Sequence, residues 1–192
     1  MKKILIIVTI FFSTISTISA DEIKRIIVGD KDAKITIIAY ESLTCSHCAN
    51  FHKDVYPELK KNYLDTGLAK IEFRHFPLDI AAFNASKVSQ CNNDGDSKIL
   101  NSLFANQQKW VKGSSIQEAN ENLKKFLVSE GYNVDFEKCI NDKEIEDFVL
   151  NDRIDAVKKF KISSTPTIII NDKKFEKSLN YKNLKKALEK LI

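Results

Sequence analysis

Glycine and proline are scarce in this sequence, with five and three among 192 residues. Their scarcity excludes the Gly- and Pro-rich composition of flexible linkers and disordered chains. An excess of charge of one sign is missing as well, because 30 Lys and Arg face 26 Asp and Glu. We therefore expect no nucleic-acid partner and no attraction to an anionic membrane surface. A chain of this length is long enough for one well-buried domain that carries an insertion.

The N-terminal residues lack the apolar length that a membrane span needs. Lys2 and Lys3 precede an apolar run from Ile4 to Phe12, and Ser and Thr are frequent from there to Ala20. A spanning helix needs about 20 predominantly apolar residues, whereas this layout is typical of a cleaved secretory signal peptide. We expect residues 1–20 to be a signal peptide cleaved after Ala20, with an uncleaved anchor as the alternative.

Cysteine is absent before Cys45, so a lipid-modified cysteine at the cleavage site is excluded and we expect a soluble exported protein. Export would place the four cysteines in a compartment where disulfides persist. The expected cellular location is therefore consistent with thiol-based chemistry.

The hydrophobic pattern predicts β-strands on both sides of a helical block. Ile35 to Tyr40 is β-branched and nearly continuously apolar, as in a central strand that is covered on both faces. Residues 79–160 carry almost no β signal. We expect strands at 26–28, 33–40, 69–76, 167–170 and 173–175, and helices at 45–65 with a kink at Pro57, 80–92, 97–110, 115–130, 134–141, 143–160 and 181–191.

These elements predict an α/β fold with an inserted all-helical subdomain. The expected host domain comprises residues 21–78 and 161–192, and the helical insertion comprises residues 79–160. No linker separates the two, so we expect the insertion to pack against its host.

The tetrapeptide Cys45-Ser46-His47-Cys48 lies at the expected start of the first helix. A helix N-terminus favours a thiolate on the first sulfur, so Cys45 would attack or be attacked, and Cys48, one turn on, would resolve the mixed disulfide. His47 and Ser46 are the residues that we expect to tune the pair, because an imidazole and neighbouring amides can stabilise the Cys45 thiolate.

The same tetrapeptide has two other interpretations, half of a zinc site and a structural crosslink. Zinc would need two more ligands at metal-binding spacing, and His52 or His75 with the distant Cys91 or Cys139 makes a poor set. We therefore expect neither a metal nor a cofactor.

Ser164-Thr165-Pro166-Thr167 places a proline directly before a β-branched strand. Proline is tolerated at the first position of a strand, and that is the simpler interpretation. The alternative is a cis Thr165–Pro166 bond, whose turn would present the backbone of Thr165 to an extended peptide beside Cys45.

The strand before Thr44-Cys45-Ser46-His47-Cys48, Phe51 after it, and the late Ser164-Thr165-Pro166-Thr167 together resemble the thioredoxin superfamily. The helical block between the two halves is similar to that of the DsbA-like disulfide oxidoreductases of the bacterial periplasm. The resemblance implies a thioredoxin-like fold, a Cys45/Cys48 redox pair and a cis proline at Pro166.

Several further expectations depend on this resemblance. It implies a periplasmic monomer that introduces disulfide bonds into reduced exported polypeptides, with Thr165 and Pro166 as client-binding residues. A DsbB-like membrane quinone reductase would reoxidise it. The remaining alternatives are a disulfide isomerase or reductase on the same fold, and a non-catalytic exported peptide-binding protein.

Two further features of the chain concern the acidic residue near the motif and the second pair of cysteines. Some relatives carry a buried acidic residue six positions before the first cysteine, where this chain has Ala39, and Glu41 is a weak substitute. Cys91 and Cys139 lie near the start and the end of the helical block, and we expect them to be paired. Such a disulfide would be similar to the second, structural disulfide of some DsbA-like proteins. Two buried free thiols are the alternative.

Overall fold

The computed structural model describes residues 22–192. The predicted signal peptide, residues 1–20, therefore lies outside the described residues. Within residues 22–192, no helix combines the length and the apolar character that crossing a membrane requires.

A five-stranded mixed sheet in the order β1-β3-β2-β4-β5 forms the centre of the molecule. The parallel pair β2 and β3 lies in the middle, and the other neighbouring strands pair antiparallel. The isoleucine-rich sequence of β2 agrees with its burial on both faces. The strands are β1 (Ile26–Gly29), β2 (Ile35–Glu41), β3 (Ala69–His75), β4 (Thr167–Ile170) and β5 (Lys173–Lys174).

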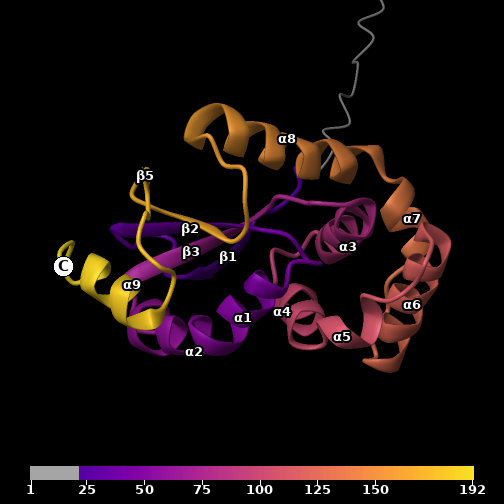
Figure 1. The fold of residues 1–192 in the computed structure, drawn as a ribbon, viewed down its shortest axis with the longest axis horizontal. Helices are drawn as coiled ribbons and strands as arrows, with labels where there is room; N and C mark the ends of the chain where they lie inside the picture. Colours follow the sequence, from indigo (N-terminus) through magenta and orange to yellow (C-terminus); the bar gives the residue numbers. More distant parts are fainter. Residues whose placement is uncertain (1–21) are drawn as a thin grey trace, which may run out of the picture.

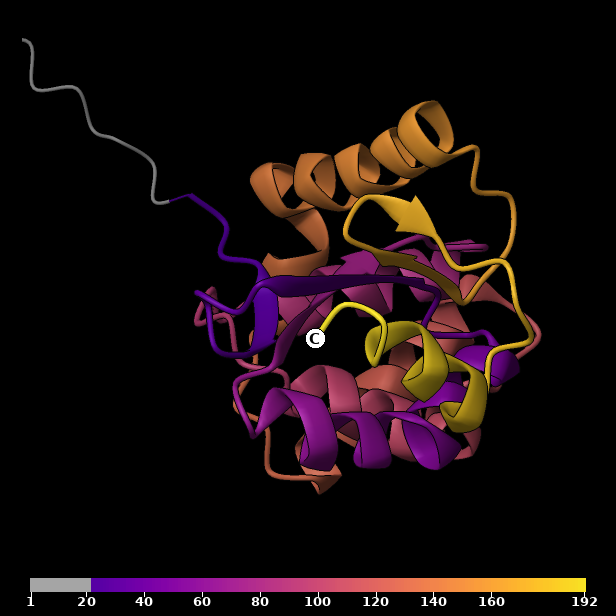
Figure 2. The ribbon, with the colours of Figure 1, turned by 90° about the vertical axis from the view of Figure 1, so that its left-hand side faces the viewer.

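Helices cover both faces of this sheet (Figures 1 and 2). On one face lie α1 (Ser46–Asp54), α2 (Tyr56–Leu59) and α9 (Tyr181–Leu188), with a π-helical turn, η1, at Lys60–Leu64. On the other face lies α8 (Lys143–Phe160). Alternate residues of β2 therefore enter two separate cores, with Ile37 and Ala39 on the α1 side and Ile38 and Tyr40 on the α8 side.

The helical block, α3 to α8, packs beside the sheet and folds back over it (Figure 1). Its last helix is fastened to the sheet by Asp152, whose side chain is buried and accepts hydrogen bonds from Arg25 of the first strand region and from the backbone N–H of His75. The remaining helices are α3 (Ile80–Gln90), α4 (Lys98–Ala105), α5 (Gln107–Trp110), α6 (Ile116–Ser129) and α7 (Phe136–Asn141).

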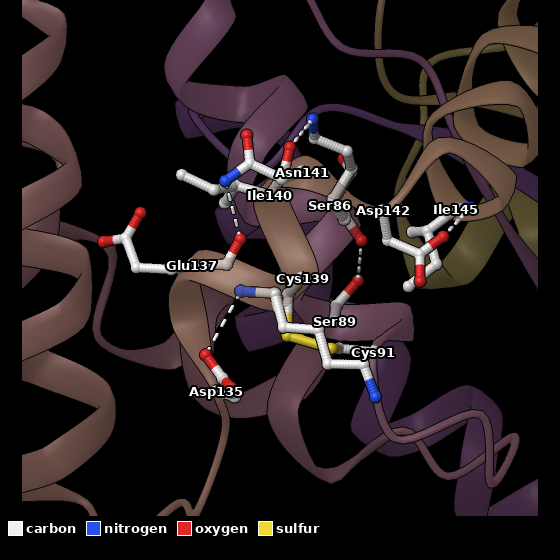
Figure 3. The surroundings of a disulfide bond; sticks show 12 residues. Ser86, Ser89, Cys91, Asp135, Glu137, Cys139, Ile140, Asn141, Asp142 and Ile145 are labelled. Atoms are coloured by element: carbon white, nitrogen blue, oxygen red, sulfur yellow. Dashed lines mark hydrogen bonds between the residues drawn. A yellow bond between two sulfur atoms is a disulfide. The ribbon is translucent and has the colours of Figure 1, made fainter.

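A disulfide joins Cys91, directly after α3, to Cys139 in α7 (Figure 3). The two Cα atoms are 5.4 Å apart, within the usual range for a disulfide, and the bond closes a sequence separation of 48 residues. It therefore connects the first helix of the helical block to the penultimate one.

Two long helices that the hydrophobic pattern predicts are interrupted in the structure. The 45–65 helix breaks at Val55, two residues before Pro57, because proline lacks an N–H and its ring crowds the preceding turn. The 97–110 helix breaks at Asn106, whose φ of −118° is not helical. Hydrophobic periodicity continues across both breaks, so it cannot locate them.

Candidate functional site

The tetrapeptide lies where β2 leads into α1, at the end of the central sheet. Cys45 is the N-cap residue of α1, and its side chain is partly exposed. Cys48 is in the first turn, with no exposed surface, and packs in the core between α1 and the sheet. Both are free thiols here, so the structure represents the dithiol form. The two sulfurs thus differ in access, as the sequence position predicts.

The surroundings of Cys45 favour its thiolate. The thiol of Cys48, the side chain of Thr165 and the backbone N–H groups of Cys48 and His47 act as hydrogen-bond donors and lower the pKa of Cys45 to about 5, against the desolvation that raises it. His47 contributes to this lower pKa of Cys45 through its backbone N–H. Cys45 would therefore be a thiolate at neutral pH.

Cys48 has the opposite electrostatics. Burial raises the pKa of its thiol far above the usual range, and the hydrogen bond to Cys45 and the negative charge of Glu41 raise it further. The pair therefore divides into a reactive, accessible thiolate and a buried thiol that keeps its proton.

Thr165 and Pro166 face this pair from the start of β4. The Thr165–Pro166 peptide bond is cis, and the backbone oxygen of Thr165 lies 3.5 Å from Cys45 Sγ. The side chain of Thr165 also lowers the pKa of Cys45, and its buried hydroxyl has no other hydrogen-bond partner among the described residues.

A groove of about 530 Å³ runs alongside α1. Its walls are His47 and Phe51 of α1, the Thr165–Pro166 turn, Leu179 before α9 and Tyr181 at the start of α9. His47 is exposed here and lines the groove, whereas Ser46 lines a cleft on the opposite side of α1. The two middle residues of the tetrapeptide thus border different depressions.

His52 and Gln107 were given no role at this site from the sequence, and Glu41 was expected only as a weak substitute for the buried acidic residue of some relatives. Glu41 and His52 form a buried pair, with Oε2 and Nε2 2.9 Å apart. Gln107 of α5 donates hydrogen bonds from Nε2 to the backbone oxygens of Leu43 and Cys45, at 2.8 and 3.1 Å. No sequence pattern indicated the contacts that His52 and Gln107 make here.

The described residues contain no group of three or more His, Cys, Asp or Glu side chains that could hold a metal ion. Cys91 and Cys139, the distant thiols weighed as zinc ligands, are joined to each other. The site as a whole is a free dithiol beside a groove of about 530 Å³, an arrangement typical of a thiol:disulfide exchange protein.

Comparison with known proteins agrees with this class. A family model described as Thioredoxin matches residues 21–190. The crystal structure of Wolbachia pipientis alpha-DsbA1 superimposes with a TM-score of 0.76 at 31% identity, covering 87% of this chain and 90% of that one. The chain therefore belongs to the thioredoxin family and, within it, to the DsbA-like thiol:disulfide oxidoreductases.

Curated relatives carry similar names. A putative protein-disulfide oxidoreductase of Rickettsia bellii is 28% identical over 92% of this chain and 67% of its own length. Disulfide bond formation protein D of Bacillus subtilis is 26% identical over 85% of this chain and 75% of its own. The chain spans only 52% to 67% of the length of the Rickettsia relatives.

Proposed function

We propose that this chain is an exported oxidase that introduces disulfide bonds into reduced polypeptides through Cys45 and Cys48. The observation that carries the proposal is the contrast between the two sulfurs, one partly exposed with a pKa of about 5 and one buried with a raised pKa. Stabilising the Cys45 thiolate stabilises the reduced form, which makes the disulfide more oxidising.

The reaction follows from this contrast. A client thiolate attacks Cys45 Sγ of the oxidised protein, the Cys45–Cys48 bond breaks, and a mixed disulfide forms between Cys45 and the client. A second client thiolate then attacks the client sulfur, and the Cys45 thiolate leaves readily because its pKa is low. The client gains one disulfide and the protein gains the two electrons.

The groove beside Thr165 and Pro166 is the proposed place for the client. Proline has no N–H, and the backbone oxygen of Thr165 lies beside Cys45 Sγ, so an extended segment could pair with this backbone next to the reactive sulfur. Phe51, Leu179 and Tyr181 contribute apolar surface to the groove. Thr165 and Pro166 are therefore the proposed client-binding residues, with His47 and Ser46 as tuning residues.

The proposed cellular setting is the periplasm, reached through the N-terminal signal peptide. Reduced exported polypeptides would be the clients, and a membrane protein similar to DsbB would return the electrons to quinone. The Cys91–Cys139 disulfide is typical of proteins in an oxidising compartment, which supports export.

The test is the reduction potential of the Cys45/Cys48 couple, together with refolding of a reduced substrate that has several cysteines. We expect a potential well above that of thioredoxin, which is about −270 mV, and rapid formation of substrate disulfides. A potential near the thioredoxin value with no net oxidation would overturn the proposal. Reshuffling of scrambled disulfides faster than net oxidation would favour an isomerase instead.

A further inference from the structure

A cleft of about 780 Å³ lies between α1 and helices α4 and α5, on the opposite side of α1 from the groove beside Pro166. Its volume is within the range of about 300 to 1,000 Å³ that is usual for ligand sites. His52 and Phe104, whose rings stack at a centroid distance of 4.1 Å, contribute the aromatic part of its lining. The exchange reaction proposed above makes no use of this interhelical cleft.

Two buried polar atoms of the residues that line the interhelical cleft have no hydrogen-bond partner among the described residues. One is the hydroxyl oxygen of Tyr56, a residue that is only 6% exposed, and the other is Oδ1 of Asn101. Nδ2 of Asn101 donates to Ser97 Oγ at 3.1 Å, which orients the amide and leaves Oδ1 available. A buried polar group without a partner lowers stability, so a bound group that pairs with both atoms is favoured.

The two atoms have complementary hydrogen-bond roles. Burial raises the pKa of the Tyr56 hydroxyl to about 12, against a smaller lowering by the side chain of Asn101, so the hydroxyl keeps its proton at neutral pH and can donate. Oδ1 of Asn101 can only accept. A peptide group offers one C=O acceptor and one N–H donor, so it can pair with both side chains.

The charge of the interhelical cleft favours an anion. Lys53 of α1 and Lys109 of α5 are exposed and line it, and none of the described residues that line it is an Asp or a Glu. Lys109 shares its charge with Glu130, 3.4 Å away. The groove beside Pro166 has the reverse character, because Asp54 lines it and no lysine among the described residues does. The cleft therefore attracts negatively charged side chains more than the groove does.

The interhelical cleft reaches the redox motif. Ser46, the residue after Cys45, lines it, and Gln107 from its other wall donates from Nε2 to the backbone oxygen of Cys45 at 3.1 Å. Cys45 Sγ in turn lies 3.5 Å from the backbone oxygen of Thr165, which lines the groove. Cys45 thus lies between two depressions, so a chain whose cysteine is bonded to it can extend one arm into each.

We propose that the interhelical cleft is a second client subsite, which binds an acidic arm of the client polypeptide while the other arm lies in the groove beside Pro166. This inference rests on the proposed oxidation of reduced polypeptides and narrows its substrate class to cysteines with Asp or Glu nearby in sequence. Peptide groups of the arm would pair with Tyr56 and Asn101, and its carboxylates with Lys53 and Lys109. The thiol–disulfide exchange itself is unchanged.

The direct test is the binding of a short capped peptide of alternating Glu and Gly, without cysteine, to the reduced, isotope-labelled protein, followed by NMR. We expect backbone amide shifts at residues that line the interhelical cleft, and an affinity about 5-fold or more above that of the same peptide with Gln in place of Glu. Equal affinities for the two peptides would overturn the proposal. Displacement of the peptide by free glutamate at the same concentration would assign the cleft to small anions instead.

Substitutions in the cleft test the individual contacts. Tyr56→Phe removes only the hydroxyl and should weaken binding of the Glu peptide about 5-fold to 10-fold. If the folded variant binds this peptide as well as the parent does, the hydroxyl pairs with water only and the proposed contact is wrong.

Lys53→Gln covers the case in which Tyr56→Phe fails to fold, because Lys53 is exposed. It should weaken binding of the Glu peptide about 3-fold to 5-fold. Lys61→Gln is the matched control, since it removes an exposed lysine that does not line the cleft, and its affinity should stay within about twofold of the parent's. Equal losses in the two lysine variants would show a general effect of charge and contradict the subsite.

The outcome is separable from that of the proposed function. The peptides in the binding test carry no cysteine, so a protein that fails to oxidise reduced polypeptides still reports on the cleft. A second readout is the rate at which the oxidised protein forms a disulfide in two-cysteine peptides with a Glu or a Gln arm. The Glu arm should react about 5-fold faster at low salt and lose this advantage at high salt, because salt screens exposed charges. Equal rates at low salt would leave the oxidase in place and remove the acidic preference.

Discussion

Cys45 Sγ lies 3.5 Å from the backbone oxygen of Thr165, a residue 120 positions later in the chain. The contact joins the N-terminus of α1 to the turn that begins β4, across the edge of the groove. β4 pairs directly with β2, which leads into Cys45, so the central sheet holds both partners in place. A peptide segment in the groove would therefore meet the sulfur of Cys45 and the backbone of Thr165 together.

Replacing the two cysteines of the tetrapeptide should have different consequences. Cys45→Ala removes the accessible thiolate, so thiol exchange with any disulfide should fall to background. Cys48→Ala leaves that thiolate in place but removes the resolving sulfur, so mixed disulfides should persist. Gel mobility under non-reducing conditions after incubation with a disulfide-bonded client measures both, because the Cys45 thiolate attacks the client disulfide and displaces one client thiolate. Equal trapping by the two variants would contradict the assigned roles.

The thiolate of Cys45 should be visible as ultraviolet absorbance near 240 nm with a midpoint at about pH 5. Its pKa in the folded protein lies below that of an unfolded cysteine, about 8.5, so thiolate formation stabilises the folded, reduced form. That contribution is complete above about pH 8.5 and is lost as pH falls toward about 5. Denaturant unfolding of the reduced protein at several pH values should show the trend, and Cys45→Ser should abolish it.

The Cys91–Cys139 disulfide should act on stability and leave exchange intact. It closes a sequence separation of 48 residues, for which the chain-entropy model gives about 4 kcal/mol. The double variant Cys91→Ala/Cys139→Ala should lower the free energy of unfolding by up to this amount, as measured in denaturant. Its rate of thiol exchange at Cys45 should stay within twofold of the parent's. A parallel loss of stability and of exchange rate would refute the purely structural role of this disulfide.

Gln107 should position the loop that carries Cys45. Gln107→Leu removes hydrogen bonds to the backbone oxygens of Leu43 and Cys45, each worth about 1 kcal/mol. We expect a loss of about 1 to 2 kcal/mol in unfolding free energy and a rise in the pKa of Cys45, read from its thiolate absorbance.

Gln108→Leu is the control for that substitution, because Gln108 is the exposed neighbour of Gln107. It should change neither the unfolding free energy nor the absorbance midpoint of Cys45. A different result is that Gln107→Leu lowers the unfolding free energy and leaves the pH midpoint of the Cys45 thiolate absorbance unchanged. That result would show that Gln107 serves only packing between the helical block and the sheet.

Much of the fold follows from local sequence. The β-branched runs predict β2 and β4, and the polar turn at Asn171 and Asp172 precedes β5, where the structure has them. The prediction of an α/β fold with a helical block between its two halves is confirmed by the topology and by the match to the thioredoxin family. These features are readable because strand and helix periodicity are properties of neighbouring residues.

The redox motif could likewise be found from the sequence, because the chemistry of Cys45 depends on its place at a helix N-terminus, a local property. Thr165 and Pro166 were expected beside the motif from the resemblance to the thioredoxin superfamily, whereas its other partners could not be found from the sequence. His52 and Gln107 reach the site only through the packing of α1 against the sheet and against α5, and Glu41 is significant because its neighbours bury it. Side-chain burial and contacts between distant segments arise from the close packing of the whole molecule, so tertiary structure alone decided how the Cys45/Cys48 pair is surrounded.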